Sequence, residues 1–267
     1  MFNLPKTLTS LVVAATLAPL CVFAAPQMQE SAFFQEEVNS GDLPPIQDRI
    51  PEDPLVIDLE AKGRAFGIQG GTLNTMVTRS KDIRQMVVYG YSRLVGYDEN
   101  YILRPDLLAS YENENNRKFT LHLRNGHRWS DGTPFTSEDF RYWWEDVANS
   151  PQLSPAGPPD FLRIEGELPQ VSFPDAQTVI YEWANPNPNF LQSLAQARPP
   201  FIYRPAHFLK TFHAKYADPA TLVEEVDYYR VKSWPALHNK LDNMYKFDNH
   251  ELPTLQPWVN ATSGKKI

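Results

Sequence analysis

The residues best suited to chemistry lie together in the stretch HRWSDGTPFTSEDFRYWWED, from His127 to Asp146. Its most suggestive feature is a pair of adjacent carboxylates, Glu138 and Asp139. A glycosidase needs two carboxylates that face each other from separate elements, whereas neighbours on one helix point about 100° apart. We therefore interpret the pair as acidic residues that offset the dipole at a helix start, and not as an acid–base pair.

Other catalytic patterns are missing from the sequence. The six histidines are scattered, with no H-E-x-x-H and no cysteine cluster, so neither a metal site nor a cofactor is expected. There is no G-x-S-x-G elbow, no P-loop and no G-x-G-x-x-G. A serine triad assembled from distant residues stays open, because triads are recognised by geometry and not by sequence order. The sequence favours a protein that is not an enzyme.

The same stretch is predicted to consist of two turns and a helix. Ser130-Asp131-Gly132, after Trp129, has the composition of a tight turn. Thr136, with Asp139 three residues later, predicts a capped helix start. An apolar stripe at helical spacing follows, formed by Phe140, Trp143, Trp144 and Val147. Aromatic residues make up 12% of the chain. We expect most of them in the core and a minority in a cleft, where they would stack on sugars or peptide side chains.

Short strands and helices alternate along the rest of the chain. KFTLHLRNGHRW predicts a hairpin that turns at Asn125-Gly126, and GGTLNTMV predicts a strand from Gly70 to Val77. QVSFPDAQTVIYEWA predicts two more strands. Helices are predicted in SKDIRQMVVYGYSRLVGYD, PNFLQSLAQA and AHFLKTFHAKYAD, and in part of residues 221–250. This mixture is typical of an α/β or α+β architecture.

The N-terminus is predicted to direct export. Lys6 precedes an apolar run, and Val22-Phe23-Ala24 resembles a signal-peptidase site, so residues 1–24 are interpreted as a cleaved signal peptide. An uncleaved anchor is the alternative. Residues 25–60 are acidic and Pro-rich, which predicts an extended arm or, up to about Pro51, disorder. The net charge of -7 argues against nucleic-acid binding.

With these pieces placed, LLASYENENNRKFTLHLRNGHRWSDGTPFTSEDFRYWWEDV resembles the signature region of bacterial extracellular solute-binding proteins of family 5. These are the oligopeptide- and dipeptide-binding proteins of ATP-binding-cassette importers. The family pattern is matched in order and spacing by Leu108-Ala109, Phe119 to Arg124, Trp129 to Phe135 and Thr136 to Asp139. GGTLN resembles the family's first strand, and the resemblance extends from about Leu43 to Val259.

The resemblance implies a periplasmic-binding-protein-like type II α/β fold, in which two lobes close on a ligand about a hinge. Family members are roughly twice this length. We therefore expect residues 61–267 to form a partial lobe I, with an inserted subdomain at about 95–184 and the second lobe missing. The candidate ligand-binding residues follow GGTLN and are Thr78, Arg79, Arg84, Tyr89 and Tyr91. The simpler alternative is that the tyrosines belong to the core and the arginines are solvated.

The function implied is capture of peptides or similar polar oligomers in the periplasm, by a monomer that delivers them to an inner-membrane permease. Oligosaccharides are the rival ligands within the family. Two further hypotheses are a truncated or split-gene fragment without binding activity of its own, and a secreted hydrolase. A lone lobe would expose its cleft face, because only half of the clamp would be present.

Overall fold

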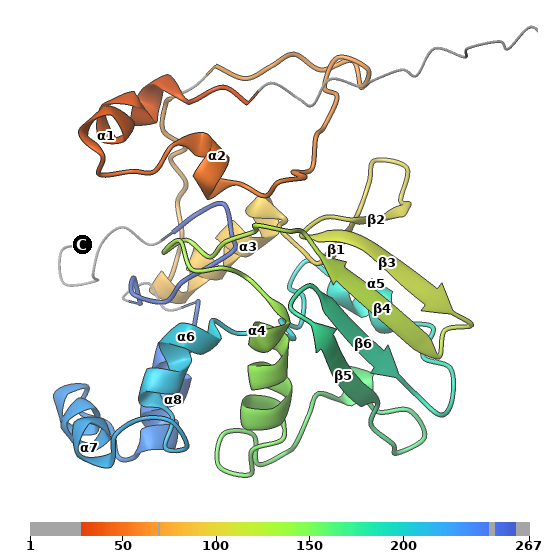
Figure 1. Ribbon diagram of the computed structural model, residues 1–267, viewed down its shortest axis with the longest axis vertical. Helices are drawn as coiled ribbons and strands as arrows, with labels where there is room; N and C mark the ends of the chain where they lie inside the picture. Colours follow the sequence, from red (N-terminus) through yellow and green to blue (C-terminus); the bar gives the residue numbers. More distant parts are fainter. Residues whose placement is uncertain (1–27, 69, 246–248, 260–267) are drawn as a thin grey trace, which may run out of the picture.

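The structure is a computed structural model that describes residues 28–68, 70–245 and 249–259. The signal peptide predicted for residues 1–24 lies outside them. Within the described part of the chain, every helix is too short or too polar to cross a membrane. The body is mixed α/β, with one sheet, a small hairpin and a group of short helices, and an N-terminal arm lies across one end (Figure 1).

The main sheet has four antiparallel strands in the order β3-β4-β6-β5. Their bounds are Leu108–Glu114 for β3, Lys118–Leu123 for β4, Gln170–Asp175 for β5 and Thr178–Glu182 for β6. The predicted alternation decides which face is buried, because successive side chains on a strand point to opposite sides. Phe119 and Leu121 of β4, and Val179 and Tyr181 of β6, form the buried face. A separate hairpin pairs β1 (Val95–Tyr97) with β2 (Leu103–Pro105).

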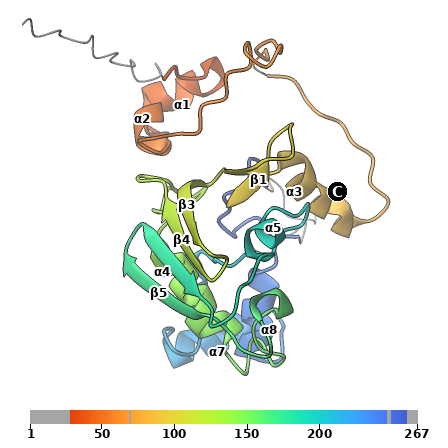
Figure 2. The same ribbon diagram turned by 90° about the vertical axis from the view of Figure 1, so that its right-hand side faces the viewer.

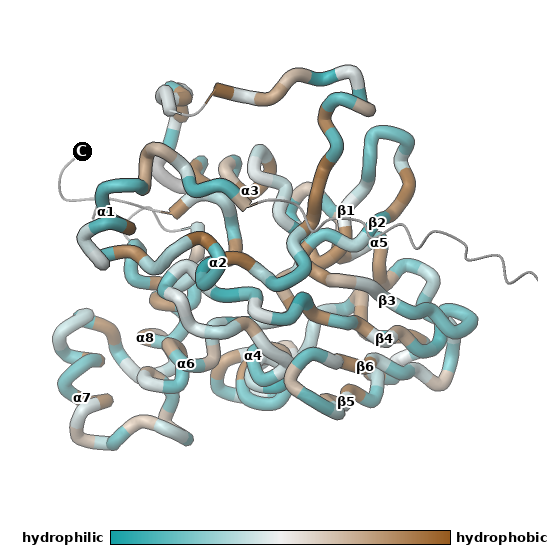
Figure 3. Tube along the Cα trace, turned by 45° about the horizontal axis from the view of Figure 1, so that its top comes forward, coloured by the Kyte–Doolittle hydropathy of each residue, from teal (hydrophilic) through white to brown (hydrophobic). Residues whose placement is uncertain are grey.

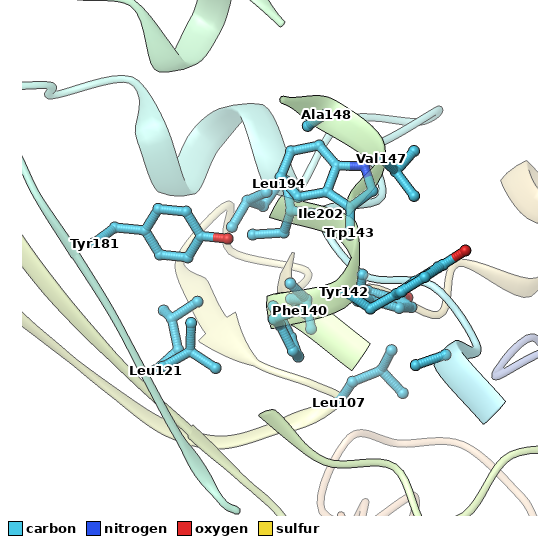
Figure 4. Close-up of a cluster of buried hydrophobic side chains, with 14 of the residues drawn as sticks. Leu107, Leu121, Phe140, Tyr142, Trp143, Val147, Ala148, Tyr181, Leu194 and Ile202 are labelled. Carbon is cyan, nitrogen blue, oxygen red and sulfur yellow. The ribbon is translucent and has the colours of Figure 1, made fainter. Parts of the chain in front are cut away.

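Helices cover the buried face of the sheet. The longest helical run joins α4 (Ser137–Tyr142) to a π-helical segment (Trp143–Ala148). Figure 4 shows Trp143 of this run and Tyr181 of the sheet directed into one apolar cluster. The helices that follow it in the chain are α5 (Phe190–Leu194), α6 (Ala206–Leu209), α7 (Pro219–Tyr228) and α8 (Trp234–Leu241), with 3-10 turns at Asp160–Leu162 and Lys210–Phe212.

The predicted hairpin at Asn125-Gly126 is wrong. Both edges of β4 are already paired, one with β3 and the other with β6, so no edge is left for the residues after Gly126. The hairpin turn instead lies at Asn115 and Asn116, which have φ angles of 55° and 57° and join β3 to β4. Asparagine tolerates this left-handed conformation better than most residues. Gly126, with φ of 74°, forms a turn that leads into a loop.

The N-terminal arm is helical in part, and so the extended arm predicted for residues 25–60 is corrected. It contains a 3-10 turn (Ala32–Phe34) and two short helices, α1 (Gln35–Ser40) and α2 (Ile46–Arg49). The arm is attached to the body at the Asn125 turn. The Glu52 N–H donates to the Asn125 carbonyl at 3.0 Å, and the Asn125 side chain donates to the Glu52 carboxylate at 2.6 Å.

The strand predicted from Gly70 to Val77 does not form. The segment is extended and passes around the outside of the body to a 3-10 turn (Ser80–Arg84) and α3 (Gln85–Gly90), as Figure 2 shows. No described residue supplies a strand beside it, and a strand needs a neighbour to accept and donate its hydrogen bonds. Its side chains are exposed, with Met76 at 100% and Leu73 at 66%. Figure 3 shows that hydrophobic stretches are found outside the sheet as well as within it.

Candidate ligand-binding site

Asp139 is the centre of the packing around the Trp-Ser-Asp-Gly turn. It is only 3% exposed, and its carboxylate accepts from the Thr136 N–H at 2.9 Å, the Trp129 indole N–H at 3.2 Å and the Ala206 N–H at 3.0 Å. The predicted capping box between Thr136 and Asp139 forms, and the Thr136 hydroxyl also accepts from the Glu138 N–H at 3.3 Å. Burial raises the pKa of Asp139 to about 6, against the pull of these hydrogen bonds. Asp139 therefore has a structural role, because its carboxylate joins the helix start to Trp129 and Ala206.

Glu138, the neighbouring carboxylate, points to the surface. It binds Arg141 and Lys210 at 2.5 Å each. The two carboxylates of the pair therefore serve different surroundings, one buried and one half-exposed, as the 100° between neighbouring helical positions requires. The two carboxylates have no hydrogen-bond or ion-pair partner in common among the described residues.

The Trp-Ser-Asp-Gly turn holds a distant segment of the chain. Ser130 and Thr254 exchange two hydrogen bonds of 3.0 Å, one from the Ser130 N–H to the Thr254 carbonyl and one from the Thr254 N–H to the Ser130 hydroxyl. The Ser92 hydroxyl donates to the Leu255 carbonyl at 3.2 Å on the other side. Asp131 holds the turn to α6 through His207 at 2.6 Å. Residues 252–256 are thus fixed over the body between two loops.

A cavity of about 290 Å³ lies beside this segment. Aromatic and apolar side chains form much of its wall, together with three side-chain amides, one threonine and one ion pair. The lining residues of most interest are Trp129, Phe201, Tyr203, Arg204, Asp242, Asn239, Asn243, Tyr245, Thr254 and Gln256. A concave, mostly apolar site with a few polar groups is typical of small-molecule binding.

An ion pair between Arg204 and Asp242 supplies the charge in this cavity. The Arg204 Nε lies 2.5 Å from the Asp242 Oδ1, although the contact is poorly aligned for a hydrogen bond. Arg204 also donates through Nη1 to the carbonyls of Phe201 and Tyr203, both at 2.8 Å. Burial raises the pKa of Asp242, and the neighbouring guanidinium opposes that rise.

Three of the predicted ligand-binding residues meet at Asp82. Its carboxylate accepts from the Thr78 hydroxyl at 3.0 Å and from the Arg79 N–H at 3.2 Å, and it lies 3.6 Å from the Arg84 guanidinium. This arrangement fixes the start of the 3-10 turn before α3. It also holds the three residues close together on the surface.

The two predicted tyrosines have different surroundings. The Tyr91 hydroxyl donates to the Ala195 carbonyl at 2.9 Å, and the buried Arg93 guanidinium stacks on the Tyr91 ring at 4.5 Å. Tyr89 is 61% exposed. Tyr89 lies in α3 and Tyr91 directly follows it. The end of this helix approaches the 252–258 segment closely, since a side chain at Gly90 would lie 2.7 Å from Pro257. None of the five predicted residues lines the cavity.

Sequence reasoning assigned Trp129 to a structural turn and did not predict it, Tyr203, Arg204, Asp242 or Gln256 as cavity residues. No local signal marks them, because they come from a loop, the end of α8 and the segment that Ser130 holds. Among the residues that the structure describes, no group of three or more metal-ligating side chains comes together. The candidate site is therefore a cavity able to bind a ligand through stacking and hydrogen bonds.

The comparison with known families identifies the class. The model of the bacterial extracellular solute-binding proteins, family 5, middle region, matches residues 103–242, which is more than half of the chain. The chain belongs to this family. The matched region contains strands β3 to β6 and the Trp-Ser-Asp-Gly turn, whose residues carry the resemblance described above.

Individual relatives agree with that assignment. The periplasmic alpha-galactoside-binding protein of Rhizobium meliloti (strain 1021) is 26% identical over 252 residues, which is 83% of this chain and 32% of that protein. The periplasmic oligopeptide-binding protein OppA of Salmonella typhimurium is 30% identical over 144 residues, which is 49% of this chain and 26% of OppA. Both relatives are described as periplasmic binding proteins.

A solved structure confirms the predicted fold class. An oligopeptide-binding protein OppA superposes with a TM-score of 0.79 and 31% identity, and covers 90% of this chain and 36% of that chain. The α/β fold is thus that of the periplasmic binding proteins. The chain spans about a quarter to a third of the length of these relatives.

Proposed function

We propose that this chain acts in the solute-binding component of an ATP-binding-cassette importer, which captures oligopeptides or similar polar oligomers in the periplasm. The observation that carries the proposal is the superposition on OppA across nine-tenths of the chain. Export by a cleaved signal peptide and delivery to an inner-membrane permease belong to the same proposal. So does action as a monomer.

The ligand contacts proposed on this chain are the residues gathered at the start of α3. Thr78, Arg79 and Arg84 present hydroxyl and guanidinium groups on one surface, and Tyr89 offers an exposed ring. Such groups suit peptide backbones and carboxylates, which guanidinium groups bind in a two-pronged fashion. Tyr91 would act by fixing this region to the body through Ala195.

Oligosaccharides are a second ligand class favoured by a specific observation. The relative that matches 83% of this chain is described as binding alpha-galactosides. Aromatic residues in the cavity suit sugar rings as well as peptide side chains. The third possibility is a fragment that binds nothing by itself, and the chain covers about a third of each of these two proteins.

A ligand screen tests the proposal. The chain would be purified alone and as a fusion with the part of OppA that it does not match, and the cooperative unfolding of each would be verified by circular dichroism. Peptides and oligosaccharides would then be added, since a ligand that binds only the native state raises the unfolding temperature. We expect a shift with the fusion. A folded fusion that responds to no ligand of either class would contradict the proposal.

A further inference from the structure

Arg93 is a charged residue that the fold buries completely, shortly after α3 ends. Its exposed fraction is 0%. The guanidinium group stacks on the Tyr91 ring at 4.5 Å, and the Arg93 backbone N–H donates to the Asp106 carboxylate at 2.9 Å. Burying a guanidinium group is costly unless hydrogen bonds replace its hydration. The acceptors of its N–H groups therefore show which parts of the chain Arg93 holds together.

These hydrogen bonds join α3 to the loop that follows α5. Nη2 donates to the Val87 carbonyl in the last turn of α3 at 2.9 Å. Nε donates to the Gln196 carbonyl at 2.9 Å, and Nη2 also donates to the Ala197 carbonyl at 2.5 Å. Carbonyls near the end of a helix often accept hydrogen bonds from arginine side chains. One buried side chain thus fixes the end of α3 against a segment more than one hundred positions away.

Ser92, the neighbour of Arg93, brings a third segment to the same place. Its carbonyl accepts from the Arg93 Nη1 at 3.0 Å and from the Gln256 side chain at 3.2 Å. Its hydroxyl donates to the Leu255 carbonyl at 3.2 Å. The end of α3, the loop after α5 and the 252–258 segment therefore meet around one guanidinium group.

We propose that Arg93 is the positioning residue of the proposed ligand-binding surface, because it sets the orientation of α3 and of the ligand contacts around that helix. Tyr89 lies in α3, and Arg84 directly precedes it. Arg93 is too deeply buried to touch a ligand, so it acts through the helix. Lysine is no substitute, because a single ammonium group lacks the planar fork that reaches several carbonyls. The inference rests on the proposed solute-binding function and adds a residue to it.

Three variants separate this role from general support of the fold. Arg93→Met removes the side-chain hydrogen bonds, and Arg93→Lys keeps the charge without the fork. Arg124→Met is the matched control. Arg124 is also a buried arginine, 7% exposed, and it donates to the carbonyls of Asp106 and Asp53, which lie outside α3.

The orientation of α3 would be measured in the ligand-free chain by pulsed electron paramagnetic resonance between two spin labels. Cys21→Ser removes the native cysteine. The first pair of labels is attached at Tyr89→Cys in α3 and Gln170→Cys in β5. The second pair, at Gln170→Cys and Glu224→Cys, joins β5 to α7 and leaves α3 out. All three labelled positions are exposed.

In Arg93→Met the first distance distribution should widen roughly twofold, because a helix held by fewer contacts samples more positions, and the second should not change. Arg93→Lys should give an intermediate width, and Arg124→Met the width of the unaltered chain. The proposal is overturned if the first distribution stays narrow in Arg93→Met, or if Arg124→Met widens it equally. It is also overturned if both pairs widen together in both Arg93 variants, since Arg93 would then support the whole body and not α3 in particular.

Binding by the fusion with OppA tests the consequence for a ligand. The probes are trialanine and, as an alpha-galactoside, raffinose, titrated by calorimetry. For a probe that binds, Arg93→Lys should raise the dissociation constant roughly threefold to tenfold, because apparent affinity falls with the fraction of molecules in which α3 is correctly placed. Arg124→Lys should leave it unchanged. Equal constants for Arg93→Lys and the unaltered fusion would refute the positioning role. A fusion that binds neither probe would count against the proposed function, while the label distances still decide whether Arg93 positions α3.

Discussion

The sheet-and-helix body and the segment from Leu55 to Val77 contain the same kinds of apolar side chain but bury them to opposite extents. In the body, Phe190 and Tyr181 are completely buried. In the segment, Ile68 is 98% exposed and Phe66 is 70% exposed. The apolar side chains of the body are buried because β4 is paired on both edges and helices cover the apolar face of the sheet. An apolar segment forms a strand or helix of the core only where neighbouring elements pair with its backbone groups and bury its apolar side chains.

The largest expected effect is in the body. Phe190 lies 5.0 Å from Phe119, 5.0 Å from Trp183 and 5.1 Å from Tyr181, as distances between ring centres. Phe190→Ala should lower the free energy of unfolding by about 3–5 kcal/mol through lost packing and the cavity it leaves. Urea denaturation followed by circular dichroism would measure this. Phe66→Ala is the matched change in the segment and should cost less than about 0.5 kcal/mol. Equal losses would contradict the comparison.

The two adjacent carboxylates repeat the same contrast within one turn of helix. Asp139→Ala leaves the buried N–H groups of Trp129 and Ala206 without their acceptor, and removes half of the helix cap. We expect a loss of about 2–3 kcal/mol in the free energy of unfolding. Glu138→Ala removes half-exposed ion pairs and should cost about 0.5–1 kcal/mol. Both losses would be measured under one set of denaturation conditions. A loss for Glu138→Ala as large as that for Asp139→Ala would contradict the contrast between the two carboxylates.

Much of the body could be predicted because its signals are local. Alternation in Phe119–Leu123 and the capping pattern of Thr136 and Asp139 depend only on nearby residues, and both predictions are confirmed. The failed predictions depended on partners. Asn125-Gly126 is a good turn, but whether it makes a hairpin depends on which edges of β4 are free. The strand from Gly70 to Val77 has the right residues and lacks a described neighbour.

The candidate site shows a similar limit. Trp129 was recognisable as part of a turn, but its role at the cavity depends on residues 252–256, which are more than one hundred positions away. Arg204 and Asp242 are charged residues in helical and loop sequences, where a solvated position is the usual interpretation. Their partial burial as a pair follows from the packing of α8 against the body. No spacing along the chain indicates it.

A pH series separates Asp139 from the buried histidine of α8. Asp139 has a pKa of about 6 in the folded protein, so between pH 6 and 4 the folded state holds a proton that the unfolded state lacks. Acidification over this range therefore favours folding through Asp139. Burial, reinforced by His213, lowers the pKa of His238 to about 3, and here the unfolded state takes up the proton below pH 6.5. Acidification opposes folding through His238.

The two substitutions should consequently change the pH slope of stability in opposite directions. Asp139→Asn should make the loss of stability on acidification steeper, and His238→Gln should make it shallower. The change is up to about 1.4 kcal/mol per pH unit for each group. Denaturant titrations at pH 7, 6, 5 and 4 would measure the slopes. Slopes that move in the same direction for both variants would show that these groups do not titrate as their burial requires.

The smallest expected effect on stability is in the exposed segment, where it tests the comparison most directly. Met76 is 100% exposed, so Met76→Lys removes no packing and should change the free energy of unfolding by less than about 0.5 kcal/mol. It should nevertheless reduce the binding of a hydrophobic dye and any self-association at high concentration, because exposed apolar patches promote both. Thr72→Lys, also exposed, adds the same charge without removing an apolar group. If Met76→Lys destabilised the fold by more than about 1 kcal/mol and Thr72→Lys did not, the side chain would have to be packed in solution. The segment would then belong with the body, and the difference between the two regions would disappear.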